Sequence, residues 1–189
     1  KDGEEVHKYK TDPLRADTDG DGLNDGDEVV KYKTDPNKVD TDGDGLNDYA
    51  ELMTHNTSPL KADTDSDGLT DSDEINKYKT SPVKHDSDND GLNDGDEVVK
   101  YKTDPLKSDS DGEGLSDSEE ILKYKTNPLN KDTDDGTVDD FTEVKRGTDP
   151  LMTDDDVVKI GVPIVLEGIT FDVNKATIKP ESENTLMKA

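Results

Sequence analysis

Residues 17–28 read Asp17-Thr18-Asp19-Gly20-Asp21-Gly22-Leu23-Asn24-Asp25-Gly26-Asp27-Glu28, and closely similar stretches begin again at regular intervals. Each new start lies 23 residues after the one before, at Asp40, Asp63, Asp86, Asp109 and Asp132. Acids stand at positions 1, 3, 5, 9 and 12 of the stretch, and glycine stands at position 6. In calcium loops of this length, those five side chains and the position-7 carbonyl surround one ion. The pattern predicts a tandem array of calcium loops.

The predicted metal ligands occupy the same loop positions in every copy, and the position-7 residue contributes its backbone carbonyl. In the first three loops they are Asp17, Asp19, Asp21, Leu23, Asp25, Glu28, Asp40, Asp42, Asp44, Leu46, Asp48, Glu51, Asp63, Asp65, Asp67, Leu69, Asp71 and Glu74. In the last three they are Asp86, Asp88, Asp90, Leu92, Asp94, Glu97, Asp109, Asp111, Glu113, Leu115, Asp117, Glu120, Asp132, Asp134, Val138, Asp140 and Glu143.

The last two loops depart from the pattern. In the fifth, Glu113 replaces the position-5 aspartate and places a longer side chain in a tight loop. In the sixth, Gly136 takes position 5 and Thr137 takes the glycine position. The sequence therefore predicts about five calcium sites and a sixth, degraded loop.

The charge of the chain belongs to the repeats. The 189 residues include 49 acids and 23 bases, for a net charge of −26, with 26% hydrophobic residues. Residues 1–156 hold 45 acids and 19 bases, whereas residues 157–189 hold four of each. A chain this acidic repels nucleic acid phosphates and anionic membranes, so neither is an expected partner. There is no cysteine, so disulfides cannot stabilise the fold.

Carboxylates gathered in one loop need a cation. Two of them about 4 Å apart repel by roughly 4 kcal/mol at an effective dielectric near 20. Hard oxygen donors suit calcium, and a bidentate glutamate at position 12 favours it over the strictly octahedral magnesium. Zinc prefers histidine or cysteine ligands. Five filled loops would change the net charge from −26 to −16.

The segment between loops predicts a short helix and a turn. Residues 25–33 can form two helical turns, with acids at the start and lysines at the end, as the helix dipole favours. Proline disfavours helix at the residue before it, so the helix should end before Asp35, which precedes Pro36. Recurring leucines at position 7 predict a thin apolar seam beside the ions. Because a small repeat contacts mainly its neighbours, we expect an elongated array of mostly irregular, calcium-stabilised repeats with short helices.

The tandem Asp-x-Asp-x-Asp-Gly-Leu-x-Asp loops resemble thrombospondin type 3 repeats of the cysteine-free kind found in bacterial envelope proteins. The resemblance covers residues 2–156. EF-hands and dockerins usually carry the apolar residue at position 8, whereas here position 8 is polar and position 7 is apolar. Eleven residues interrupted by a proline separate successive loops, which leaves no room for two EF-hand helices.

Residues 157–189 form a second module in this reading. Residues 164–182 resemble the opening of an α/β OmpA-like peptidoglycan-binding domain, with a first strand over 164–171 and a first helix near Pro180. The residues by which that family holds peptidoglycan would lie beyond Ala189, so none in this chain is assigned that role. Residues 2–6 align with residues 25–29, and we expect the chain to be a piece of a longer protein.

Two functions fit these observations, and neither is catalytic, because no nucleophile with a base and no phosphate-binding loop is present. The first is a calcium-stiffened spacer between an outer-membrane or surface module and a peptidoglycan-binding domain, located in the bacterial cell envelope, periplasm or outer-membrane surface. The alternative is a calcium-dependent adhesion or protein-docking module. The expected partners are calcium and other envelope proteins.

Overall fold

The computed structural model describes residues 5–153, 165–166, 169–172 and 177–178. It divides into two compact units. The first contains residues 1–110 and 116–118, and the second contains residues 111–115 and 119–189. The expected module boundary at residues 156–157 lies outside the described residues and stays a prediction.

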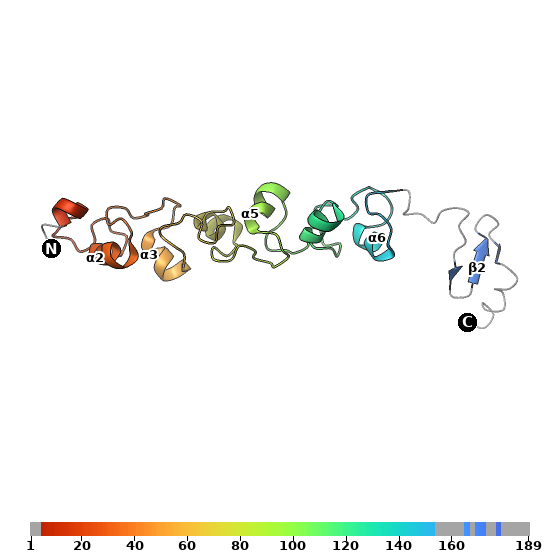
Figure 1. Cartoon of the computed structure of the whole chain (residues 1–189), viewed down its shortest axis with the longest axis horizontal. Helices are drawn as coiled ribbons and strands as arrows, with labels where there is room; N and C mark the ends of the chain where they lie inside the picture. Colours follow the sequence, from red (N-terminus) through yellow and green to blue (C-terminus); the bar gives the residue numbers. More distant parts are fainter. Residues whose placement is uncertain (1–4, 154–164, 167–168, 173–176, 179–189) are drawn as a thin grey trace. The chain divides into compact units, whose positions relative to one another are not determined.

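The described repeats consist of irregular loops joined by short helical segments, as the sequence predicts, and no strand occurs between residues 5 and 153. In the first unit the helical segments follow one another in chain order (Figure 1). Their bounds are η1 Glu5–Tyr9, α2 Asp25–Asp27, η2 Glu28–Tyr32, α3 Asp48–Ala50, η3 Glu51–His55, α4 Asp71–Asp73, η4 Glu74–Tyr78, α5 Asp94–Asp96 and η5 Glu97–Tyr101. The second unit holds η6 Glu119–Tyr124 and α6 Asp140–Arg146.

The α segments begin at loop position 9, directly after the polar residue at position 8, which caps α3, α4 and α5 through its side chain, whereas Asn24 before α2 makes no such bond. The side chains of Asn47, Thr70 and Asn93 accept hydrogen bonds from the backbone N–H three residues later. This is the usual N-cap bond, and it explains why position 8 is polar. The expected helix over residues 25–33 is present as α2 and η2, but its second half is a π-helical turn rather than an α-helical one.

The π turns end at a residue in the left-handed conformation. Lys33 has φ +69° and donates its backbone N–H to the Glu28 carbonyl. Its Nζ also folds back to the carbonyl of Val30 at 2.7 Å. Lysine therefore satisfies carbonyls at a helix end where glycine is the commoner residue. The helix ends before Asp35, in agreement with the proline signal.

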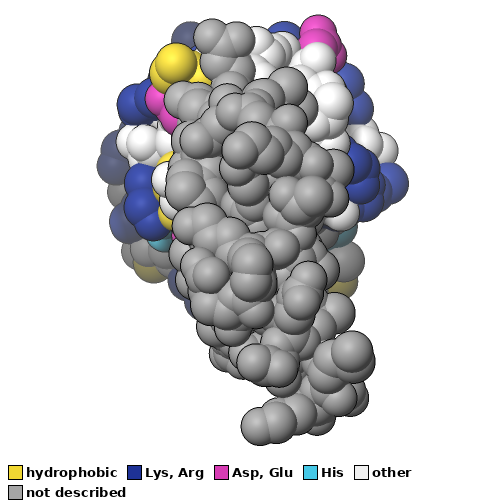
Figure 2. Space-filling view, turned by 90° about the vertical axis from the view of Figure 1, so that its right-hand side faces the viewer, with side chains coloured by type: hydrophobic (Ala, Val, Ile, Leu, Met, Phe, Trp, Pro, Cys, Tyr) yellow, Lys and Arg dark blue, Asp and Glu magenta, His cyan; other side chains and the backbone are white. Residues whose placement is uncertain are grey.

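Few apolar side chains are buried. Among the described residues, the buried hydrophobic side chains are Leu23, Leu69, Leu92 and Leu115, all at loop position 7. Acids are seen at few places in the view of Figure 2, where lysine and arginine side chains stand out at the edges of the described surface. Four of the six position-7 residues are thus buried, whereas a continuous seam beside the ions stays a prediction.

The tail differs from the expected first strand. Residues 164–171 do not form one strand: β1 Val165–Leu166 pairs antiparallel with β2 Ile169–Asp172, and β3 Thr177–Ile178 pairs antiparallel with β2. The register pairs Val165 with Thr170 and Leu166 with Ile169, so the described residues of the expected strand belong to two antiparallel strands. The helix expected near Pro180 lies outside the described residues.

Candidate metal centre

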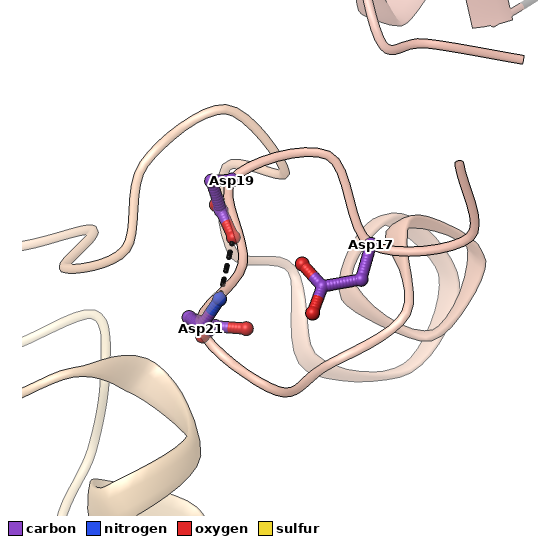
Figure 3. A group of neighbouring side chains, drawn as sticks. All are labelled: Asp17, Asp19 and Asp21. Atoms are coloured by element: carbon purple, nitrogen blue, oxygen red, sulfur yellow. Dashed lines mark hydrogen bonds between the residues drawn. The ribbon is translucent and has the colours of Figure 1, made fainter. Parts of the chain in front are cut away.

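The acids of the first loop are held by its own backbone. Asp17 accepts hydrogen bonds from the N–H groups of Gly20 at 2.6 Å and Gly22 at 3.2 Å. Asp19 accepts from Asp21 N–H at 3.1 Å, and Asp21 accepts from Leu23 N–H at 2.7 Å. Figure 3 shows the three carboxylates pointing into the ring that the loop forms. Each acid is thereby fixed on the loop.

Loops two to four repeat these bonds at the same positions. The position-1 acids Asp40, Asp63 and Asp86 accept from the backbone N–H groups at positions 4 and 6. The glycines at position 6 have φ between +106° and +109°, a conformation that favours glycine. The glycine signal in the sequence is therefore a backbone requirement of the loop.

These acids form a first group of possible ligands in each loop. One oxygen from each of Asp17, Asp19 and Asp21 lies within 4.8 Å of the others. The same is true of positions 1, 3 and 5 in the second and third loops, Asp40, Asp42 and Asp44, and Asp63, Asp65 and Asp67. Three carboxylates this close can surround one divalent cation.

A second group combines two successive repeats. Asp21 and Glu28 of the first repeat lie with Asp48 of the second, again with ligand atoms within 4.8 Å of one another. Asp67 and Glu74 of the third repeat form the same group with Asp94 of the fourth. In this group the position-9 acid lies with acids of the preceding repeat, whereas the sequence analysis placed it with the acids of its own loop. That all five acids of a loop surround one ion stays a prediction. The position-5 acid belongs to both groups.

The most deeply buried side chains of the described chain are acids. The position-12 glutamates Glu28, Glu51, Glu74, Glu97, Glu120 and Glu143 are 0% exposed, as are the position-9 aspartates Asp48, Asp71, Asp94, Asp117 and Asp140. In the first four repeats, Oε2 of the glutamate is buried without a hydrogen-bond partner. The Oδ2 atoms of Asp19, Asp42, Asp65 and Asp88 share this property. Oxygens of this kind are costly to bury without a cation.

Two sets of hydroxyl residues position these acids, and the sequence reasoning missed both. Thr34 Oγ1 donates to Glu28 Oε1 at 3.2 Å, whereas Oε2 is buried without a hydrogen-bond partner. Thr41 donates its N–H and its Oγ1 to the two oxygens of Asp48, at 2.8 and 2.6 Å. Partners of metal ligands often orient them in this way. The signal was present, because every repeat carries threonine two residues before the proline and threonine or serine at position 2.

Burial and neighbouring carboxylates raise the pKa values of the grouped acids. Desolvation is the main cause at Glu28, where the pKa rises to about 7, and Asp19 is the next cause. Glu51, Glu74 and Glu97 reach about 8 for the same reason, with the position-3 aspartate of their own loop as the second cause. Asp42 and Asp88 reach about 6. Burial without a cation therefore shifts these groups toward the protonated form.

The fifth loop is divided between the two units: Asp109 and Asp117 belong to the first, and Asp111, Glu113 and Glu120 to the second. Within the second unit, Glu113 Oε1 accepts from Leu115 N–H at 2.7 Å, the bond that aspartate makes at position 5 elsewhere. The longer side chain is therefore accommodated.

The sixth loop lacks an acid at position 5 but keeps its other features. Asp140 accepts from the N–H and Oγ1 of Thr133 at 2.8 and 2.7 Å. The Asp132 and Asp134 carboxylates both accept from Gly136 N–H, at 2.9 and 2.8 Å. Asp140 is also close enough to Glu113 to raise the pKa of that carboxyl. The sixth loop thus offers an acid to the repeat before it.

Two further expectations concern exposure. The position-7 residues Leu46 and Val138 are half-buried rather than buried, and the role of position-7 carbonyls as ligands stays a prediction. Asp27, Asp73 and Asp96, next to the position-12 glutamate, are exposed in the first helical turn. Their placement suits the helix dipole rather than the acid groups.

The comparison with protein families finds the bacterial TSP3 repeat five times, at residues 17–39, 40–62, 63–84, 86–108 and 109–131. These matches cover more than half of the chain. The chain belongs to the bacterial TSP3 repeat family. The five matched TSP3 repeats start at the positions that the loop pattern gives, and the sixth loop lies outside the match.

Two solved structures share sequence with a part of this chain. One is "Biofilm associated protein - B domain", 51% identical over 24% of this chain and 11% of that one, with a TM-score of 0.24. The other is "Biofilm associated protein - BSP domain", 52% identical over 23% of this chain and 8% of that one, with a TM-score of 0.23. This chain therefore spans a small part of either structure. No curated protein matches the chain. None of the described helices is long and apolar enough to cross a membrane.

Proposed function

We propose that the TSP3 repeats bind calcium and that each complete repeat takes two ions, one in each acid group. The first ion would be held by positions 1, 3 and 5, as in Asp17, Asp19 and Asp21. The second would be held by positions 5 and 12 together with position 9 of the next repeat. The second ion would therefore bridge two repeats, and calcium would fix how one repeat is placed on the next.

The observation that carries the proposal is the position-12 glutamate. Glu97 is 0% exposed, Thr103 Oγ1 donates to its Oε1 at 3.1 Å, and its Oε2 is buried without a hydrogen-bond partner. The carboxylates of Asp88 and Asp90 lie close enough to raise its pKa. Such a side chain is stable only if it is protonated or bound to a cation.

The donor set favours calcium among the common cations. Both groups present carboxylate oxygens, and neither contains histidine or cysteine, the donors that zinc prefers. Calcium accepts six to eight oxygens in variable geometry, which suits groups assembled from two repeats. Magnesium requires a near-ideal octahedron and loses its waters reluctantly.

The role that follows is structural rather than catalytic. The array would act as a calcium-stiffened spacer in a protein of the bacterial cell envelope, between a surface or outer-membrane module and a peptidoglycan-binding domain. The repeat-to-repeat acid groups support the stiffening, and the OmpA-like resemblance of residues 164–182 supports the anchor. Small-angle scattering should give a radius of gyration well above the about 16 Å of a compact chain of this length in calcium, and a different value in chelator.

Calcium binding is tested best with two neighbouring acids in one repeat. Glu97→Gln removes the charge of a buried ligand, and Asp96→Asn removes the same charge from an exposed position. We expect Glu97→Gln to lose one or two bound ions by isothermal titration calorimetry, whereas Asp96→Asn keeps the stoichiometry of the parent protein. Equal losses, or no calcium uptake by the parent protein, would contradict the proposal.

A docking function is the second candidate, and one observation favours it. In five of the turns an apolar side chain that is about half exposed follows the proline, namely Leu60, Val83, Leu106, Leu129 and Leu151. Leu60→Ser, Leu106→Ser and Leu129→Ser together should leave calcium uptake unchanged. If cells carrying this variant lose adhesion while the calcium-bound dimensions stay the same, the docking function is preferred to the spacer.

A further inference from the structure

The residue at loop position 10 forms the contact between each repeat and the loop before it. The Tyr49 ring lies against Gly22, and the Phe141 ring lies against Gly114. A Cβ atom added to either glycine would meet the ring at 3.1–3.2 Å. At Gly95 an added Cβ would lie 2.3 Å from the carbonyl oxygen of Asp67, so only glycine fits there. One contact is thus made by side chains of very different size.

Small residues at position 10 permit a hydrogen bond between the repeats. The backbone N–H of position 10 lies in the first turn of the helical segment, where N–H groups have no acceptor within their own helix. It donates to the position-5 carboxylate of the preceding loop from Ser72 to Asp44 at 3.0 Å, from Gly95 to Asp67 at 3.1 Å, and from Ser118 to Asp90 at 2.8 Å. The other oxygen of each carboxylate accepts from its own loop at position 7. Both oxygens are therefore held before any ion arrives.

The first aromatic junction lacks this bond. With Tyr49 at position 10, Asp21 keeps its bond to Leu23 N–H, but its Oδ2 is buried without a hydrogen-bond partner. The ring lies against Gly22, where a serine places only its small hydroxymethyl group against Gly45 and Gly91 at other junctions. One oxygen of this shared acid is therefore positioned by the loop alone.

The second aromatic junction has the bond because the acid is longer. Glu113 Oε1 accepts from Leu115 N–H at 2.7 Å, and Oε2 accepts from Phe141 N–H at 2.5 Å. The extra methylene lets the carboxylate reach across the ring contact while it keeps its bond within the loop. The two departures from the repeat pattern, Glu113 and Phe141, therefore compensate one another.

We propose that the residue at position 10 selects how firmly each repeat is coupled to the preceding acid group, and that Glu113 is a positioning residue that restores this coupling across Phe141. The hydrogen bonds at position 10 do not depend on the proposed calcium binding. Any effect of these bonds on ion affinity rests on the proposed function. The Tyr49 junction is then the loosest of those described, and the glycine and serine junctions are firm.

The first test adds a methylene at the loose junction. In Asp21→Glu the carboxylate should reach Tyr49 N–H, so amide hydrogen exchange at Tyr49, followed by NMR in saturating calcium, should slow by about five- to tenfold, as one added hydrogen bond implies. Asp67→Glu is the matched control, because Gly95 N–H is already bonded and its exchange should not slow. Unchanged exchange at Tyr49, or equal slowing in both variants, overturns the proposal.

The second test breaks and repairs the compensated junction. Glu113→Asp should speed exchange at Phe141 by a similar factor, and adding Phe141→Ser should bring the exchange of residue 141 back toward that of Ser118. If Glu113→Asp is neutral, or if Phe141→Ser does not restore protection, the assignment of Glu113 is wrong. Calorimetry on the same samples separates the two ideas: absent calcium uptake counts against the proposed function, and these exchange results alone decide the junction.

Discussion

The fourth loop, residues 86–97, and the sixth, residues 132–143, have the same buried acids and different loop interiors. Both bury the acids at positions 9 and 12 completely, and both fix the position-9 acid through the residue at position 2. The fourth loop has an acid at position 5 and glycine at position 6, whereas the sixth has Gly136 and Thr137. The position-5 acid can thus be lost while the frame around positions 9 and 12 remains.

The difference between the fourth and sixth loops shows that each loop contributes acids to two groups. Positions 1, 3 and 5 serve its own acid group, and position 9 serves the group of the repeat before it. The sixth loop gives up a ligand of its own group but still brings Asp140 toward Glu113 of the fifth. A loop that lacks the position-5 acid can therefore still supply the position-9 acid to the group of the preceding repeat.

Removing calcium should have the largest effect, and it should separate the two loops. At an ion concentration of 100 times the dissociation constant, binding stabilises a folded unit by about 2.7 kcal/mol, or roughly a hundredfold in opening. We expect chelator to raise amide exchange around Leu92 by at least about this factor and around Val138 by much less. Equal changes in amide exchange in the two loops would show that they bind calcium equally. If exchange does not change, calcium does not stabilise the fold.

Truncating the position-12 glutamate should come next. Glu97→Ala removes a proposed calcium ligand from a complete loop. It should lower the free energy of unfolding in calcium by more than about 2 kcal/mol, as loss of a metal ligand typically does. Glu143→Ala removes an equally buried side chain from a loop that lacks the position-5 acid, and less than about 1 kcal/mol is expected. Thermal unfolding monitored by circular dichroism compares them. The reverse order would mean that the sixth loop is the stronger site.

Substitutions of the position-9 acid test whether it contributes to the acid group of the preceding repeat. Asp94→Asn should weaken calcium binding by Asp67 and Glu74 of the third repeat, because these three form one group. Asp140→Asn should act in the same way on the fifth repeat, although it lies in the degraded loop. Each change should cost about one bound ion, and exchange should quicken in the repeat before the substitution. Loosening confined to the substituted loop would show that position 9 serves its own loop.

Protonation of the buried acids should stabilise the metal-free fold in part, by less than calcium does. The pKa of Glu97 is raised to about 8 in the folded protein, above its ordinary value near 4.5. A raised carboxyl pKa stabilises the metal-free fold at low pH, and this stability is lost as the pH rises through about 8. In chelator, a shift from about pH 8.5 to about pH 6 should recover part of the helical signal, first in the complete loops. A signal that falls over this range would contradict the sign.

The sequence predicted the loops, the helical segments and the acids that converge, because all three depend on residues within one repeat. It did not predict that Asp48 lies with Asp21 and Glu28, since the grouping depends on how one repeat packs on the next. Local spacing alone is equally compatible with one ion or two. The roles of Thr34 and Thr41 were missed for a related reason: a hydroxyl two residues before a proline is explained by the turn until its acceptor is known.

The dominance of carboxylates in the interior has a consequence for the heat capacity. An ordinary domain exposes apolar surface when it unfolds, and its heat capacity rises by about 12–15 cal/mol/K per residue. Here the newly hydrated groups are mostly acids, and hydration of polar surface lowers the heat capacity, so the increment should be far smaller. The unfolded chain would expose little additional apolar surface, and repulsion due to its charge of −26 would oppose aggregation. Emptying and refilling the loops should then be reversible without precipitation.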